Sequence, residues 1–171
     1  MDDLHERLAN PVHVVVAIVA TWLVLSSPWV ELYKHLPPDA GWITRLHVWL
    51  GLATLLLAVG YLGLCARGGR WRTYFPWAGG QMDAVRRDLA GLVRGRMPSV
   101  EGGGLFALIE GLLLLALVAA GVTGVMWLVA AGTSDAVAWR SWHLGAARAT
   151  AGLLLAHVIG VMLHWLEFVR G

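Results

Sequence analysis

Four long apolar segments dominate this chain of 171 residues and limit the folds that are open to it. We place them at about residues 11–32, 42–65, 105–129 and 142–168. Each segment is long enough to cross about 30 Å of hydrocarbon at a rise of about 1.5 Å per residue. A bilayer core offers the backbone no water, so segments of this kind cross it as helices. The sequence therefore predicts an all-α, integral membrane four-helix bundle.

The composition agrees with a membrane protein. Hydrophobic residues make up 58% of the chain and charged residues 14%, whereas a soluble domain averages about 45–50% and about 25%. These values exclude a disordered chain and argue against an ordinary soluble enzyme. No repeat or soluble domain remains once the four segments are assigned, so we expect residues 1–171 to form a single membrane domain.

Basic residues are concentrated in the connection between the second and third segments, residues 66–104. The arginines of this basic loop are Arg67, Arg70, Arg72, Arg86, Arg87, Arg94 and Arg96. Because positively charged loops stay on the cytoplasmic side, we expect both chain termini to be cytoplasmic. The formal net charge is only +2, so the arginines indicate membrane topology and no nucleic-acid partner is expected.

Part of the basic loop has the pattern of an amphipathic helix. Apolar residues recur at helical spacing, opposite three of the arginines, at Met82, Val85, Leu89, Leu92 and Val93. This pattern predicts a short helix that lies on the inner membrane surface and contacts lipid. Docking of the same helix on a partner protein is the alternative.

Histidines inside the apolar segments indicate a function, because polar groups in a membrane span are costly and rare. His143 and His157 are fourteen residues apart, close to four helical turns, so they share a face and differ in depth by ~21 Å. His47 lies at the depth of His143, and His13 lies near the depth of His157. The four side chains therefore form an outer pair and an inner pair, each drawn from two helices.

Two facing imidazoles from different helices are what a b-type haem with two histidine ligands requires. With both axial positions filled by protein, such an iron transfers electrons and does not readily bind a substrate. The ~21 Å between the two pairs excludes a single metal site, and two histidines alone make a poor zinc site. The alternative for each histidine is an interfacial or hydrogen-bonded residue.

Small and basic residues near these histidines are further candidates. Gly51, Gly111 and Gly124 would let a flat cofactor approach the helices, although simple helix packing also explains them. Arg148, inside the fourth segment, and Arg45, beside His47, are candidate partners of haem propionates. Their alternative is an ordinary place at the membrane interface.

The complete pattern resembles the prokaryotic cytochrome b561 family. The resemblance rests on the four spans, on His13 after Asn10-Pro11, on Arg45-Leu46-His47, and on Trp142-His143 with thirteen residues between His143 and His157. It covers almost the whole chain. The same pattern is similar to the cytochrome b subunits of nickel–iron hydrogenases and formate dehydrogenases.

The resemblance implies two haem b groups, one held by His13 and His157 and the other by His47 and His143. It also implies a multi-pass protein of the bacterial inner membrane that exchanges electrons between the quinone pool and a redox partner protein or catalytic subunit. We interpret the chain as the electron-transfer subunit of a quinone-linked oxidoreductase and leave open whether it is itself an enzyme. Homodimerisation is also left open. Two alternatives remain: a stand-alone quinol oxidoreductase acting on a small redox molecule such as superoxide, and a haem-free membrane anchor.

Two further residues are candidates for a quinone site. Glu110 lies about one turn into the third segment, where it could accept a proton during quinone turnover or pair with an arginine of the basic loop. His164 lies two turns beyond His157 on the same face and is also its rival as the inner ligand. His5 and His35 fall in solvated segments, and we expect no cofactor there.

Overall fold

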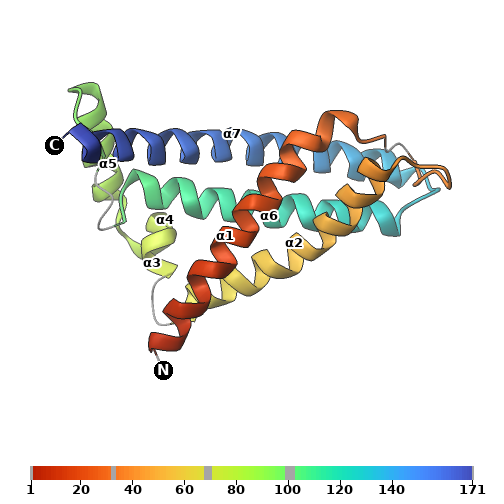
Figure 1. The fold of residues 1–171 in the computed structure, drawn as a ribbon, viewed down its shortest axis with the longest axis horizontal. Coiled ribbons are helices and arrows are strands. Elements are labelled where there is room, and N and C mark those ends of the chain that lie inside the picture. The colour runs from red at the N-terminus through yellow and green to blue at the C-terminus, as the bar shows by residue number, and fades with distance from the viewer. Residues whose placement is uncertain (1, 32–33, 68–70, 99–102, 171) are drawn as a thin grey trace. The chain divides into compact units, whose positions relative to one another are not determined.

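The computed structural model describes residues 2–31, 34–67, 71–98 and 103–170. Within these ranges the regular structure is helical and contains no strand (Figure 1). The long helices are α1 (Asp2–Ser26), α2 (Trp42–Ala66), α6 (Leu105–Val129) and α7 (Asp135–Arg170). Each is long and apolar enough to cross a membrane. The predicted all-α class and the four membrane-length helices are confirmed.

The first long helix differs from its predicted span at both ends. It begins at Asp2, so Pro11 lies inside the helix and not at its start. It ends at Ser26, and a short 3₁₀ helix, η1 (Ser27–Trp29), follows. Pro28 favours this end, because proline has no backbone N–H to donate to the preceding helical turn and disfavours the α conformation of the residue before it. Leu32, the predicted end of the span, lies outside the described residues.

The fourth long helix starts earlier than predicted, at Asp135 instead of residue 142. A carboxylate in the first turn is favourable, because it lies near the free N–H groups and the positive end of the helix dipole. The prediction placed the start too late because it followed hydrophobicity alone.

The chain divides into two compact units. The first unit comprises residues 1–64 and 115–151, and the second comprises residues 65–114 and 152–171. The first unit therefore contains α1, nearly all of α2, the second part of α6 and the first part of α7. The second unit contains the helices of the basic loop, the first part of α6 and the last part of α7. The single-domain organisation stays a prediction.

In the first unit, hydrogen bonds from backbone N–H groups join segments near the ends of the helices. Thr44 Oγ1 accepts a hydrogen bond from the Glu31 N–H at 3.2 Å, and the Gly132 N–H donates to the Lys34 carbonyl at 2.8 Å. Gly121 of α6 lies against α2, where an added Cβ would be 2.8 Å from Leu55 Cδ1. Glycine is needed at this position because the two helices approach closely there.

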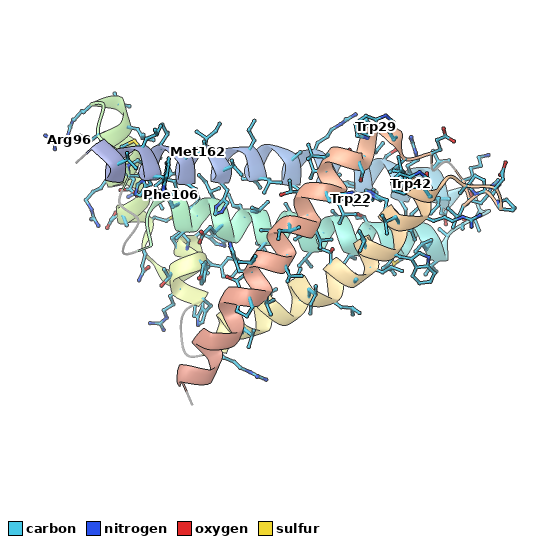
Figure 2. The ribbon with its side chains drawn as sticks, in the orientation of Figure 1. Trp22, Trp29, Trp42, Arg96, Phe106 and Met162 are labelled. Carbon is cyan, nitrogen blue, oxygen red and sulfur yellow. The ribbon has the colours of Figure 1, made fainter. Side chains whose placement is uncertain are left out.

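Tryptophans gather at one end of α1 and α2 in the same unit. Trp22, Trp29 and Trp42 line a shallow groove there (Figure 2). Trp29 and Trp42 are 64% and 71% exposed. Indole side chains of this kind favour the boundary between hydrocarbon and water, which agrees with a helix end at the membrane surface.

The second unit contains the three short helices of the basic loop: α3 (Trp71–Tyr74), α4 (Pro76–Gly79) and α5 (Met82–Val93). The predicted amphipathic helix is confirmed as α5. Asp88 Oδ2 accepts a hydrogen bond from the Leu105 N–H at 2.8 Å and so caps the start of α6. Val85 is buried, whereas Val93 is 90% exposed. Arg70 of the basic loop lies outside the described residues, and lipid contact by α5 stays a prediction.

Candidate functional site

The first unit contains a largely apolar, partly open cavity of about 400 Å³. Its walls come from α1, η1, α2, α6 and α7, and they include the buried side chains of Leu117 and Trp127. Cofactor pockets in proteins span about 300–1,000 Å³ and are mainly apolar, with a few polar groups. His47 and His143 are two of the polar groups of this cavity. The outer pair predicted from the sequence therefore lines one cavity.

The two imidazole rings have a spacing that suits a shared metal ion. Their centroids are 6.4 Å apart and their planes are nearly perpendicular, at 86°. A bond between an imidazole nitrogen and a metal is about 2 Å long, so two rings on opposite sides of one ion have centres about 6 Å apart. The pair from α2 and α7 matches that distance.

The tautomer of His143 is set by its surroundings. Its Nδ1 lies 2.8 Å from the Ala120 carbonyl oxygen of α6. A carbonyl only accepts hydrogen bonds, so Nδ1 carries the hydrogen and Nε2 keeps its lone pair for a metal. The ring rests against Gly124, where an added Cβ would be 3.4 Å from the ring atoms Cε1 and Nδ1. Gly124 thus gives the ring room against α6.

The Nδ1 atom of His47 differs from that of His143 in its hydrogen bonding. Its Nδ1 is buried and has no hydrogen-bond partner among the described residues. Two imidazoles are too few for a structural zinc site, but they are the complete axial set of a b-type haem with two histidine ligands. The donor set, its spacing and the apolar walls therefore fit a haem.

The predicted glycines have different surroundings. Gly51 and Gly124 line the cavity, as does Gly121. Gly111 belongs to the second unit, where an added Cβ would overlap the Tyr74 carbonyl and touch the Phe75 ring. That contact with the basic loop accounts for glycine at position 111 without a cofactor.

The two arginines predicted to bind haem propionates also differ in their positions. Arg148 lines the cavity and is exposed. Arg45 is exposed, and its Nη2 donates to the Pro38 carbonyl at 2.7 Å. Arg140 lines the cavity as well and was missed as a site residue. Its position three residues before His143, on the same face of α7, is the signal that could have identified it.

A family model for prokaryotic cytochrome b561 matches residues 4–168. The chain belongs to the prokaryotic cytochrome b561 family. No curated protein and no solved structure matches it. Membership confirms the resemblance and establishes a membrane b-type cytochrome that binds haem b and transfers electrons.

In this b561 cytochrome, the residues of the cavity have distinct tasks. His47 and His143 would hold haem b through their Nε2 atoms, and Arg140 and Arg148 would pair with its propionates. The largely apolar walls lower the local dielectric constant around these side chains. The bound haem supplies one-electron redox chemistry, and the protein supplies its ligands and its electrostatic surroundings.

His13 of the cytochrome belongs to the first unit. Its Nδ1 lies 3.4 Å from the Tyr61 hydroxyl oxygen, and the two ring centroids are 5.8 Å apart. The phenol of α2 therefore contacts the imidazole of α1. His157 belongs to the second unit, so its pairing with His13 stays a prediction.

The second unit brings the remaining predicted polar residues together in two contacts. His157 Nδ1 lies 3.8 Å from Glu110 Oε1, which links α7 to α6. The His164 ring meets the Phe106 ring edge-on, with centroids 4.9 Å apart. Gly160 gives Phe106 its space, because an added Cβ there would overlap the Phe106 ring. Glu110 thus contacts the candidate inner ligand, His157.

Proposed function

We propose that this b561 cytochrome carries two haem b groups and passes electrons between a redox partner and membrane quinone. The observation that carries the proposal is the pair of imidazoles, His47 and His143, whose centroids lie 6.4 Å apart in one apolar cavity. Membership of a cytochrome family favours this function over a haem-free membrane anchor.

We assign the second haem to His13 and His157. Glu110 supports His157 as a ligand, because axial and metal-bound imidazoles usually direct their second nitrogen to a carboxylate or a carbonyl. Glu110 Oε1 lies 3.8 Å from His157 Nδ1, which is longer than a hydrogen bond, so a small movement of the side chain would let it take this role. His164 has an aromatic neighbour instead, Phe106. This difference favours His157 over His164.

A pair of matched variants tests the assignment. His157→Ala should lose one of the two haems, because the iron loses an axial ligand. His164→Ala should keep both haems, because we assign His164 no bond to iron. The haem-to-protein ratio and the reduced visible spectrum of each purified variant provide the measurement. Loss of a haem from His164→Ala alone would reverse the assignment.

We propose further that quinone reacts near Glu110 and His164 at the bacterial inner membrane. Glu110 provides a carboxylate inside a membrane-length helix, where a proton acceptor is useful and an unneeded charge is costly. In this arrangement both termini and the arginines of the basic loop face the cytoplasm, and α5 lies on anionic lipid. The other partner is a redox protein or catalytic subunit.

Reduction by quinol in proteoliposomes tests the proposed function. Quinol added to the oxidised cytochrome should reduce its haems, and Glu110→Gln should slow the reaction by about 10²-fold, since general base catalysis contributes this much or more. Dithionite is the control, because it should reduce both proteins fully. Haems that dithionite reduces but quinol does not would contradict a quinone-linked function. Rapid quinol oxidation by superoxide without a partner protein would favour the stand-alone oxidoreductase.

A further inference from the structure

The two imidazoles of the cavity differ in what holds their second nitrogen. His143 Nδ1 donates to the Ala120 carbonyl at 2.8 Å, and its ring rests on Gly124. His47 Nδ1 is buried, but it has no hydrogen-bond partner in the described part of the chain. The second nitrogen of His143 is therefore bonded to α6, whereas the second nitrogen of His47 has no hydrogen bond among the described residues.

No nearby hydroxyl group compensates for the missing partner of His47. The cavity wall contains two buried threonines, Thr54 of α2 and Thr150 of α7. Each donates its hydroxyl hydrogen to its own helix, to the Leu50 carbonyl at 2.7 Å and the Ala146 carbonyl at 2.9 Å, respectively. Neither threonine is bonded to His47.

The glycines nearest the two rings also differ in their contacts. Gly51 lies one turn further along α2, lines the same cavity, and has no atom within 4 Å of the place that a Cβ would take. At Gly124 of α6, by contrast, the His143 ring occupies the space next to the place that a Cβ would take. The His143 ring is therefore packed against a second helix, α6, whereas the glycine one turn beyond His47 makes no contact of this kind.

These differences affect how firmly each imidazole binds a metal. A partner on the second nitrogen fixes the ring and raises the basicity of the ligating nitrogen, and its loss typically lowers metal affinity about 10–100-fold. A buried N–H without an acceptor is unfavourable and is relieved when the ring moves. Both effects strengthen the bond through His143 and weaken the bond through His47.

We propose that His143 is the fixed axial ligand of this haem and His47 the exchangeable one, so that a small neutral diatomic molecule can take the place of His47 on ferrous iron. The inference rests on the proposed haem site in the cavity. In the exchange, the bond from His47 Nε2 to iron breaks and one bond from the incoming molecule to iron forms. No electron is transferred, iron stays ferrous, and the freed imidazole remains neutral.

Carbon monoxide and a matched pair of variants, His47→Gly and His143→Gly, test the proposal in the full-length, detergent-solubilised cytochrome. After reduction by dithionite, His47→Gly should keep its haem and bind carbon monoxide at least about 10-fold more tightly than the wild type, because its competing ligand is gone. Added imidazole should restore the six-coordinate spectrum of His47→Gly. His143→Gly should lose the haem of the cavity, and its remaining carbon monoxide signal reports any other haem.

The outcomes separate the proposal from the function on which it rests. A wild-type protein without bound haem would contradict the proposed function itself. Normal haem in the wild type, with equal loss of haem from both variants or with loss from His47→Gly alone, would overturn only the proposed asymmetry. Should His47→Gly fail to fold, His47→Met serves as a second variant, because its thioether is a weaker ligand that carbon monoxide should also displace.

Discussion

Replacing His143 by alanine should remove the haem of the cavity almost completely. The substitution deletes an axial ligand together with the Nδ1 bond to the Ala120 carbonyl, which orients that ligand. The second nitrogen of His47 has no comparable hydrogen bond in the described part of the chain. With one of two proposed haems lost, we expect the haem-to-protein ratio to fall by about half.

The matched control for this variant is His35→Ala. His35 is exposed and does not line the cavity, so its loss should leave both the ratio and the spectrum unchanged. Absorbance of the pyridine haemochrome, divided by protein concentration, gives the ratio for each variant. An unchanged ratio in a folded His143→Ala protein would show that His143 holds no haem.

Filling the cavity from α2 should have a similarly large effect. Gly51 lines the cavity and has open space around the position of a Cβ. A phenylalanine at this position should fold into the apoprotein without a clash at its Cβ and place its ring where the cofactor binds. We therefore expect Gly51→Phe to lose the haem of this cavity while α2 still forms.

Gly60→Phe provides the control for this second variant. Gly60 lies on the same helix, also has no atom within 4 Å of an added Cβ, and does not line the cavity. Both substitutions change helix propensity equally, so only the occupied space differs. Equal haem content in the two purified variants would show that the cavity is not the haem site.

Hydrophobicity was enough to predict the four long helices, because a span of this length is encoded by many residues at once. The ends of the helices depend on single residues. Pro28 ends α1 before the predicted boundary, and Asp135 starts α7 earlier than the apolar pattern suggests. Both signals were present in the sequence, and both act locally through the backbone.

The outer histidines were predicted from depth alone, and the structure places them in one cavity. Their arrangement depends on residues that sequence spacing identifies less well. Arg45 lies beside His47 in sequence, yet its side chain binds the Pro38 carbonyl. Arg140 is a better candidate partner of a haem propionate than Arg45. It lies three residues before His143 on the same face of α7, and it lines the cavity.

The partner of the His143 Nδ1 atom could not be predicted from the sequence. It is a backbone carbonyl, at Ala120, and every residue offers one. Which carbonyl meets the ring depends on the packing of α6 against α7, and Gly124 permits that packing. The asymmetry between His143 and His47 therefore became visible only in the structure.

The number of haem b groups per chain is the most direct test of a cytochrome with two haems and four histidine ligands. It is measured by the pyridine haemochrome assay on the purified full-length protein, together with the reduced-minus-oxidised spectrum. We predict two haem b groups per chain, both with the sharp reduced bands of bis-histidine ligation. One haem or none, or a high-spin spectrum in the wild type, would contradict it.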